Sequence, residues 1–334
     1  MIRVWFNHWF STSYRLIELM KEDEKEEVYV IGSNRKVNAV IQKVCDEWYE
    51  EPCLDGEDYI NYCVDFCREH QVQVFVPRRK MVDISRHMDR FLRMGVRVLV
   101  DDYEKIALLN DKAAAYQMFK ECKGIHVPDY ALVRDVDSLE TAYASLKERH
   151  NDLCIKFVED EGGMSFRRLK DHVDEYQSLC TYPGNGIAYE DLIRILKPRG
   201  TFKDMMIMPY LPGDEISVDC LNTKSGLIAV PRVKGASRDE RVVFDEEIHN
   251  MCEIILKKVP LQYPCNIQFK LKGQIPYLLE INTRMSGGLQ MSCLSAGVNI
   301  PNIALNKVLG REISWDVCRE EHIVSYIEMP VIIK

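Results

Sequence analysis

The sequence predicts a small α/β domain with a doubly wound parallel sheet, followed by a larger α+β region. Two observations support this prediction. Through the first hundred residues, short apolar runs alternate with helix-like segments, which is typical of a parallel sheet covered on both faces. After residue 105 the apolar runs pair into hairpins mixed with long helices. We therefore place the domain boundary near residue 105.

Four apolar runs of the first domain have the composition of buried strands. Strands are expected at 3–6, 28–32, 72–77 and 96–100, and helices at 13–21, 39–48, 58–69 and 82–94. The turn after the first strand, Asn7 to Ser11, lacks the GxGxxG fingerprint. A dinucleotide site is therefore not expected in this domain.

The second region begins with a helix at 110–122, which Gly124 and Pro128 end. A second helix is expected to start at a capping Ser138 and to run to Arg149. Further along, strands are expected at 153–158, 205–208, 216–221 and 227–230, a helix at 245–258, and a hairpin of strands 265–271 and 277–282.

Composition limits the class of protein. The chain has 334 residues, of which 46% are apolar and 29% charged, as in soluble globular proteins. The net charge of -8 argues against nucleic-acid binding. No apolar run is long enough to span a bilayer, and no secretory signal is visible, so a cytoplasmic protein is expected.

The twelve cysteines are spread along the chain without a CxxC pair, so we expect free thiols rather than a disulfide framework. Cys63, Cys67 and His70 share one face of a helix with apolar residues. A metal site would need a fourth ligand that the sequence does not offer, so a packed helix face is expected.

The last hairpin carries the strongest chemical signal. If Leu271 lies opposite Tyr277, one face of both strands is apolar. The other face then pairs Gln268 with Glu280 and Asn266 with Asn282, and Arg284 follows. Carboxylate and amide oxygens suit Mg²⁺, whereas the alternative interpretation is a solvated sheet face.

The run from Leu278 to Gly288, LLEINTRMSGG, resembles the metal-binding strand of the ATP-grasp superfamily. The run from Cys265 to Phe269 resembles the paired strand of the large subunit of carbamoyl phosphate synthetase, where a Gln also stands in place of Glu. The EINTR part is closer to biotin carboxylase. The resemblance covers roughly residues 106 to 310 and implies Gln268, Glu280 and Asn282 as metal ligands.

The same resemblance implies an ATP site, whose segments occur along the chain in the order found in the family. Lys112 and Lys156 match the two lysines that contact ATP, and the segment with Gly162, Gly163 and Ser165 resembles the glycine-rich loop over the phosphates. The segment after residue 208 resembles the hinge that reads the adenine edge, through Pro209, Tyr210 and Leu211, and Glu215 matches the acid that binds the ribose.

The resemblance also implies Arg284, Asn282 and Lys156 as catalytic residues. Candidates for the acceptor substrate are Arg78, Arg232, Lys234, Ser286 and Gly287. The aromatic residues near the N-terminus could line the cleft, but packing in the core is the preferred interpretation for Trp5, Trp9 and Phe10. His249 is expected to be structural or solvated.

The implied fold is a pre-ATP-grasp domain at 1–105 and a two-lobed ATP-grasp domain at 106–334, with its small lobe at about 125–210. The implied function is an ATP- and Mg²⁺-dependent ligase, in which Mn²⁺ is an alternative metal. It would activate a small-molecule carboxylate as an acyl phosphate for attack by an amine or another nitrogen nucleophile. One alternative is chemistry on bicarbonate or carbamate, and another is a nucleotide-binding regulator without turnover. A homodimer stays open, and one ATP-grasp copy without a biotin carrier is expected from the length.

Overall fold

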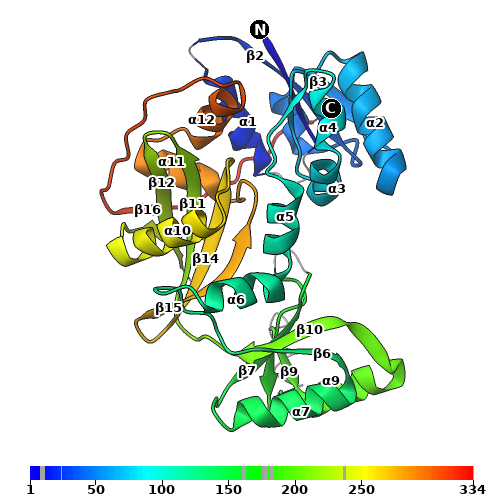
Figure 1. The fold of residues 1–334 in the computed structure, drawn as a ribbon, viewed down its shortest axis with the longest axis vertical. Coiled ribbons are helices and arrows are strands. Elements are labelled where there is room, and N and C mark those ends of the chain that lie inside the picture. The colour runs from blue at the N-terminus through cyan, green and yellow to red at the C-terminus, as the bar shows by residue number, and fades with distance from the viewer. Residues whose placement is uncertain are drawn as a thin grey trace. The chain divides into compact units, whose positions relative to one another are not determined.

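The computed structural model describes residues 1–7, 12–23, 25–159, 163–174, 176, 180, 184–235 and 238–333. Its contacts divide the chain into two compact units (Figure 1). The first unit comprises Met1–Leu109, Asp214–Gln268 and Ile281–Lys334, and the second comprises Asn110–Gly213 and Phe269–Glu280. The domains at 1–105 and 106–334 stay a prediction.

The N-terminal part of the first unit is built on a five-stranded sheet in the order β3-β2-β1-β4-β5. All four strand pairs are parallel, which confirms the predicted parallel sheet. The strands are β1 (Ile2–Phe6), β2 (Val28–Asn34), β3 (Glu47–Glu50), β4 (Val74–Val76) and β5 (Arg97–Val98).

Alternate residues of these strands pack on opposite faces of the sheet. Val4 and Phe6 join the core formed with helix α1 (Ser13–Lys21). Trp5, between them, belongs to the other core, where its ring stacks on Phe75 with centroids 4.0 Å apart. That second face is covered by α2 (Gly56–Glu69), α3 (Met81–Arg86) and α4 (Met88–Leu92). The doubly wound prediction is therefore confirmed, and Trp5 is a core residue.

The predicted helix at 39–48 is wrong. This segment forms a short 3-10 helix, η1 (Val40–Val44), and then strand β3. Trp48 pairs in register with Gly32 of β2, and a Cβ at Gly32 would lie only 2.8 Å from the Trp48 ring. The glycine therefore makes room for an aromatic strand residue, a tertiary effect that helical spacing does not reveal. The predicted helix at 82–94 is divided at His87 into α3 and α4.

The second unit contains a sheet in the order β6-β10-β7-β8-β9, with one face covered by two helices. The two helices are α7 (Val136–Lys147) and α9 (Tyr189–Leu196). The ring of Tyr143 on α7 stacks on the ring of Tyr189 on α9 with centroids 3.7 Å apart, so the helices lie side by side (Figure 1). The other elements are β6 (Ala131–Asp135), β7 (Leu153–Phe157), β8 (Arg167–Lys170), β9 (Gly186–Ala188), η2 (Lys197–Arg199) and β10 (Thr201–Pro209).

Ser138 does not cap the helix that follows β6. The cap is Asp135, whose carboxylate accepts the Ser138 N–H, while the Ser138 hydroxyl reaches back to the Asp135 backbone. This reciprocal capping box starts the helix at Val136, two residues before the expected position. The helix ends at Lys147 rather than at Arg149.

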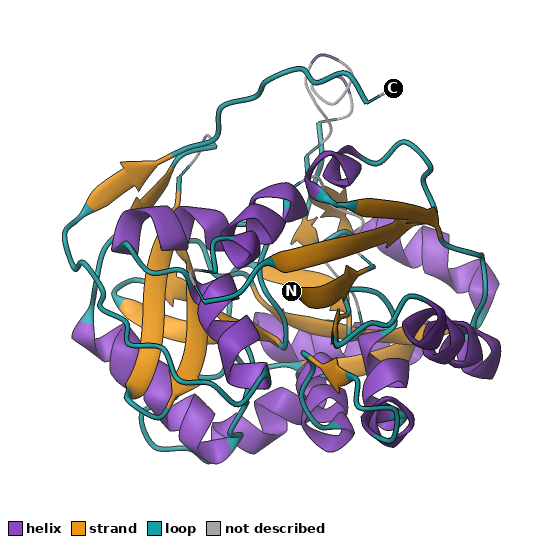
Figure 2. Ribbon diagram, turned by 90° about the horizontal axis from the view of Figure 1, so that it is seen from above, coloured by secondary structure: helices purple, strands orange, loops and turns teal. Residues whose placement is uncertain are grey.

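The third sheet has the order β15-β14-β11-β12-β13-β16. The pairs β11–β12, β12–β13 and β13–β16 are antiparallel, and the first of them is the hairpin predicted around residues 222–226. Figure 2 shows these strands together with the helices of the chain. The elements are β11 (Glu215–Thr223), β12 (Gly226–Lys234), β13 (Glu240–Val242), α10 (Glu246–Lys258), β14 (Cys265–Lys272), β15 (Ile275–Asn282), α11 (Leu289–Ala296), α12 (Ile300–Val308) and β16 (His322–Val324), besides α5 (Tyr103–Asn110) and α6 (Lys112–Lys120).

All twelve cysteines are free thiols, as predicted. Cys63 and Cys67 are fully buried on the inner face of α2, where burial raises the pKa of each thiol, and the His70 ring packs on Phe66. The packed helix face is therefore confirmed. In the described part of the chain, no helix is both long and apolar enough to cross a membrane.

Candidate functional site

Two lysines of the second unit are buried. Lys112 begins α6, and the preceding Asp111 caps the helix by accepting two backbone N–H groups. Lys156 lies in the middle of β7, and the two side chains are only 7% and 8% exposed. Buried ammonium groups are costly unless they are paired, so their presence in a core position points to function.

Glu280 lies beside the first of these lysines. The Lys112 Nζ is 3.9 Å from a Glu280 carboxylate oxygen and donates to the Val158 carbonyl at 3.3 Å. The Lys156 Nζ lies 5.8 Å from the centroid of the Tyr116 ring. The second unit thus brings together three predicted site residues, and we call Lys112, Lys156, Tyr116 and Glu280 the lysine cluster.

Tyr116 is the member of this cluster that the sequence analysis missed. It lies one helical turn after Lys112, and its hydroxyl donates to the Leu279 carbonyl at 2.7 Å. Burial raises the pKa of Tyr116, so the phenol stays neutral. The spacing of four residues from Lys112 on one helix was the available signal.

An apolar wall adjoins the lysine cluster. Ala113 and Tyr116 pack with Cys154, Val158, Met206 and Met208, and the half-buried rings of Phe166 and Tyr210 complete the wall. Burial raises the pKa of the Cys154 thiol to about 12, so this cysteine is a packing residue and not a nucleophile. Apolar side chains beside a small number of polar groups are typical of small-molecule sites.

The predicted glycine-rich loop is described only in part. Glu161 and Gly162 lie outside the described residues. Gly163 has a φ of 65°, a conformation that favours glycine, and the Ser165 hydroxyl accepts the Phe157 N–H at 2.9 Å. This bond anchors the end of the loop next to Lys156 on strand β7.

The segment predicted as a hinge leaves strand β10 at Pro209. The Tyr210 N–H donates to the Asp152 carbonyl at 2.8 Å, and Leu211 is buried. The Gly213 N–H donates to the Leu271 carbonyl at 3.0 Å, and a Cβ at Gly213 would lie 2.6 Å from that oxygen. The chain can therefore follow this path only with glycine at position 213.

Gly213→Ala is expected to lower the free energy of unfolding by about 1–3 kcal/mol, because the added methyl group must displace backbone. Urea unfolding measures this change. Gly184→Ala is the control, since a Cβ at Gly184 meets nothing within 4 Å. Equal stability of the two variants would contradict the close approach at Leu271.

In the first unit, a chain of hydrogen bonds orients Gln268. The Asn266 Nδ2 donates to the Asp219 carboxylate at 2.9 Å, which fixes the orientation of the Asn266 amide. The Gln268 Nε2 then donates to the Asn266 Oδ1 at 3.2 Å. Because the Gln268 side-chain nitrogen faces Asn266, the side-chain oxygen of Gln268 points away from Asn266.

The predicted metal ligands are divided between the two units. Gln268 and Asn282 belong to the first unit and Glu280 to the second. Glu280 and Asn282 are two residues apart on strand β15, so they share one face of that strand. No group of three His, Cys, Asp or Glu side chains that could hold a metal ion is present in the described ranges, so the metal set of Gln268, Glu280 and Asn282 stays a prediction.

Glu215 and Lys234 form an ion pair across the β11–β12 hairpin. The register pairs Ile216 with Val233, so the two side chains are cross-strand neighbours. Each group offsets the charge of the other, and both are partly exposed. Their predicted roles toward ribose and substrate stay predictions.

Arg232 lies deep in the first unit with 2% of its surface exposed. Its guanidinium binds the Asp219 and Glu240 carboxylates. Burial disfavours the charged guanidinium, but the two carboxylates outweigh that effect and raise the pKa of Arg232. The Ser286 hydroxyl also accepts from this guanidinium, at 3.1 Å.

Arg78 follows β4, at the carboxyl ends of the parallel strands. Its backbone N–H donates to the Asn7 Oδ1 at 2.6 Å, and the Asn7 Nδ2 donates to the Tyr59 hydroxyl at 2.8 Å. Tyr59 in turn donates to the buried Glu51, which also pairs with Arg79 at 3.2 Å. Asn7 follows β1, so this network spans the point where the strand order reverses, the usual place for a ligand in such sheets. The proposed cleft residues Trp9 and Phe10 lie outside the described residues.

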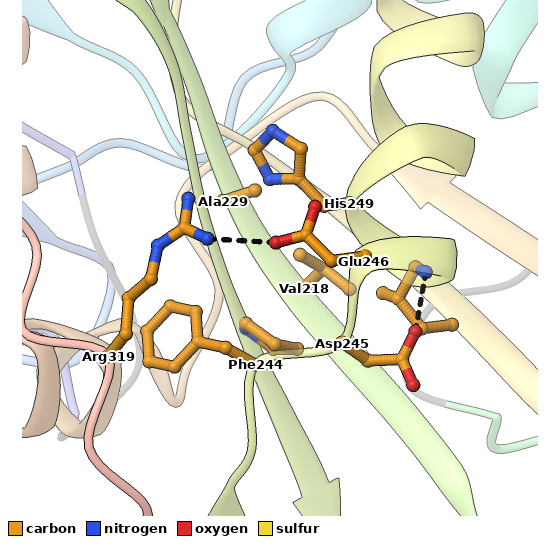
Figure 3. Close-up of a pocket in the computed structure, with 9 residues that line it drawn as sticks. Val218, Ala229, Phe244, Asp245, Glu246, His249 and Arg319 are labelled. Atoms are coloured by element: carbon orange, nitrogen blue, oxygen red, sulfur yellow. Dashed lines mark hydrogen bonds and ion pairs between the residues drawn. The ribbon is translucent and has the colours of Figure 1, made fainter.

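Described residues of the first unit line a small cavity and a larger one. The smaller, about 10 Å³, lies beside the first turn of α10, where the Glu246 carboxylate pairs with Arg319 (Figure 3). It has room for about one water molecule, and His249 on its rim pairs with Glu253 at 3.7 Å. The second cavity, about 500 Å³, lies between α1, α11 and the segment 325–327.

Part of the chain matches a known protein family. The family described as "ATP-grasp in the biosynthetic pathway with Ter operon" matches residues 201–330. The carbamoyl phosphate synthase large chain of Pseudothermotoga lettingae is 21% identical over 320 residues, covering 91% of this chain and 28% of that protein. The chain is therefore similar to the ATP-grasp superfamily, as its sequence motifs predicted.

Solved structures share the ATP-grasp fold. The biotin carboxylase domain of 2-oxoglutarate carboxylase from Hydrogenobacter thermophilus, a dimer with MgADP, ADP and bicarbonate, has a TM-score of 0.70 at 17% identity, over 96% of this chain and 73% of that one. The N5-carboxyaminoimidazole synthetase of Staphylococcus aureus with ADP has a TM-score of 0.73 at 12% identity, over 98% and 82% of the two chains. The predicted ATP-grasp fold is therefore confirmed.

The chain spans less than a third of the length of the curated relatives that it matches. A second such relative, the carbamoyl phosphate synthase large chain of Pyrococcus furiosus, is 26% identical over 145 residues, or 38% of this chain and 14% of that protein. The predicted likeness to carbamoyl phosphate synthase is confirmed, while the individual site residues stay predictions.

Proposed function

We propose that this protein is an ATP- and Mg²⁺-dependent ligase that activates a small-molecule carboxylate as an acyl phosphate for attack by a nitrogen nucleophile. The observation that carries the proposal is the lysine cluster. Two buried ammonium groups and one carboxylate next to an apolar wall match the needs of a nucleotide, which presents an aromatic base and a polyanion. The presence of Glu280, Asn282 and Arg284 together with both lysines in the sequence favours a ligase over a nucleotide-binding regulator without turnover.

Lys112 and Lys156 would neutralise phosphate oxygens of ATP. Each ammonium is a point charge with three donors, and burial strengthens its attraction for an anion. The anchored Ser165 would hold the loop that excludes water from the reacting groups. The half-buried rings of Phe166 and Tyr210 in the apolar wall would pack against the adenine ring.

Glu280, Asn282 and Gln268 would hold Mg²⁺. The proposal is supported by the oxygen chemistry of these side chains and by the Gln268 amide, whose nitrogen donates to Asn266 so that its oxygen would be the ligand. One carboxylate suffices, because Mg²⁺ in nucleotide enzymes also takes phosphate oxygens and waters. When bound, Mg²⁺ would neutralise charge on the transferring phosphoryl group.

The reaction would proceed in two steps, a phosphoryl transfer and then an acyl transfer. A carboxylate oxygen of the substrate attacks the γ-phosphorus and ADP leaves, which forms the acyl phosphate. A nitrogen nucleophile then attacks the acyl carbon and releases inorganic phosphate. Arg284 would stabilise the transferring phosphoryl group and the oxyanion of the second step.

Bicarbonate or carbamate as the activated carboxylate is a second candidate. One fold neighbour binds bicarbonate, and the matched carbamoyl phosphate synthases and Gln268 favour the same chemistry. A homodimer is a further option, because that neighbour is a dimer. Mn²⁺ accepts the same oxygen ligands as Mg²⁺.

ADP release from Mg·ATP tests the proposal. The protein is incubated with pools of carboxylates, amino acids or bicarbonate, with and without amines. A pool-dependent burst of ADP is expected, and dividing the active pool identifies the substrate. Turnover in no pool would contradict the ligase and favour a nucleotide-binding regulator, provided that Mg·ATP still binds in calorimetry.

Arg78→Gln is expected to raise the KM of the carboxylate substrate by about 10- to 100-fold, because a guanidinium binds a carboxylate through charge-assisted hydrogen bonds. The KM of ATP should stay within about 2-fold, since Arg78 lies at the ends of the N-terminal strands. Initial-rate kinetics separate the two constants. The control is Arg93→Gln on the exposed end of α4, and an unchanged KM for the carboxylate would remove Arg78 from the acceptor site.

A further inference from the structure

The buried Arg232 binds more than its two carboxylates. Its Nε and Nη2 donate to one Asp219 oxygen at 3.1 and 3.0 Å, and Nη1 binds Glu240. Residue 219 lies diagonally across the β11–β12 ladder and Glu240 lies on β13, so three neighbouring strands hold the guanidinium. Such an enclosed cation is fixed in position, because moving it would expose a charge without its partners.

Two of the same nitrogens, Nε and Nη2, also bind serine hydroxyls in the segment after β15. Nε donates to the Ser292 hydroxyl at 2.8 Å and Nη2 to the Ser286 hydroxyl at 3.1 Å. The Ser286 hydroxyl also accepts the Gly288 N–H at 3.2 Å, and the Ser292 hydroxyl donates to Asp219 at 2.6 Å. Two serines that flank the start of α11 are therefore bound to one guanidinium.

The backbone at Gly288 lies directly against this cation. A Cβ added there would lie 2.6 Å from the Arg232 Cζ and would overlap the guanidinium nitrogens. Met285, next to Ser286, is buried in the core of the first unit. The segment 283–288 is thus fixed at Met285 by core packing, and at Ser286 and Gly288 by contact with Arg232. Arg284 lies within this segment.

We infer that Arg232 is a positioning residue, which fixes the segment 283–288 and through it Arg284, and is not itself a ligand of ATP or of the acceptor substrate. The inference rests on the proposed function insofar as Arg284 acts on the phosphoryl group. A guanidinium whose three nitrogens already bind Asp219, Glu240, Ser286 and Ser292 has its donors directed into the protein. Its effect on the reaction is therefore indirect.

Ser286→Ala tests this role, because it removes one acceptor of Arg232 and leaves both carboxylates in place. We expect kcat to fall about 10-fold while the KM of ATP stays within about 2-fold, since only the alignment of Arg284 is affected. In an Arg284→Ala background, the same change should alter the residual rate by less than about 2-fold. Arg232→Lys keeps the charge but loses the planar fork, so the same loss of kcat is expected if the variant folds.

Ser295→Ala is the matched control, because this buried α11 hydroxyl donates to the Met291 carbonyl and has no part in the contacts of Arg232 given above. A rise in the KM of ATP without loss of kcat would overturn the inference in favour of direct phosphate binding. Additive losses in the Arg284→Ala background would also overturn it.

Hydrogen exchange of the backbone amides of residues 283–285 gives a result that does not depend on turnover. Ser286→Ala should raise their exchange rates by about 10-fold, and Ser295→Ala should not. If the wild type shows no turnover, the proposed function fails while this measurement still decides the inference. Unchanged exchange would contradict the positioning role.

Discussion

Glu280→Gln lowers the Mg²⁺-dependent rate of ADP formation on the order of 1,000-fold, because it removes the one carboxylate of the proposed metal set. It also removes the carboxylate that lies 3.9 Å from the Lys112 ammonium. The volume of the side chain is conserved, so the fold should be retained. Steady-state rates at saturating Mg·ATP measure the effect.

The control for this variant is Glu253→Gln on α10, which removes a carboxylate that pairs with His249 and Lys257. Its rate should stay within about 2-fold of the wild type, as for most surface substitutions. A Glu280→Gln rate within the same range would show that Glu280 is not a metal ligand. If the wild type shows no turnover and Glu280→Gln only weakens ATP binding, the protein is a nucleotide-binding regulator.

Lys156→Met raises the dissociation constant of Mg·ATP by about 10- to 100-fold, the value of a charge-assisted hydrogen bond to phosphate. The free energy of unfolding of the protein without nucleotide should change by no more than about 1 kcal/mol, because the unbranched methionine side chain fills the space of the lysine stem beside Tyr116. Loss of binding without loss of stability separates a binding residue from a structural one. Calorimetry and urea unfolding measure the two quantities.

Lys170→Met on β8 is the control for the charge change, since Lys170 is exposed. It should leave both the dissociation constant and the stability within experimental error. If Lys156→Met destabilises the protein and binds ATP normally, the ammonium serves the fold. The lysine cluster would then lose one of its two proposed phosphate contacts.

Local patterns were sufficient to predict much of this fold. The helix Ser13–Lys21 has the predicted bounds, and α10 begins one residue after the predicted start, with Asp245 as its cap. The parallel order of the N-terminal strands follows from their alternation with helices. The failure at 39–48 has a tertiary cause, because Trp48 fits as a strand residue only where Gly32 leaves room for its ring.

The site was predicted to the extent that its residues stand in recognisable runs. Lys112, Lys156 and Glu280 come from three distant segments, and the structure places them in one unit. Tyr116 and Asp219 were missed, because the four-residue spacing of Tyr116 from Lys112 is common in helices and an aspartate in a strand carries no signal until its partners are known. Arg232 was predicted as a substrate residue, but its burial and its two carboxylate partners depend on strand register.

The central claim is that a carboxylate is activated by phosphorylation, and isotope transfer tests it most directly. The substrate selected from the pools is labelled with ¹⁸O in its carboxylate and turned over with Mg·ATP and the nitrogen nucleophile. The account predicts ADP together with inorganic phosphate that carries one ¹⁸O atom from the carboxylate. AMP and pyrophosphate, or inorganic phosphate without the label, would contradict it.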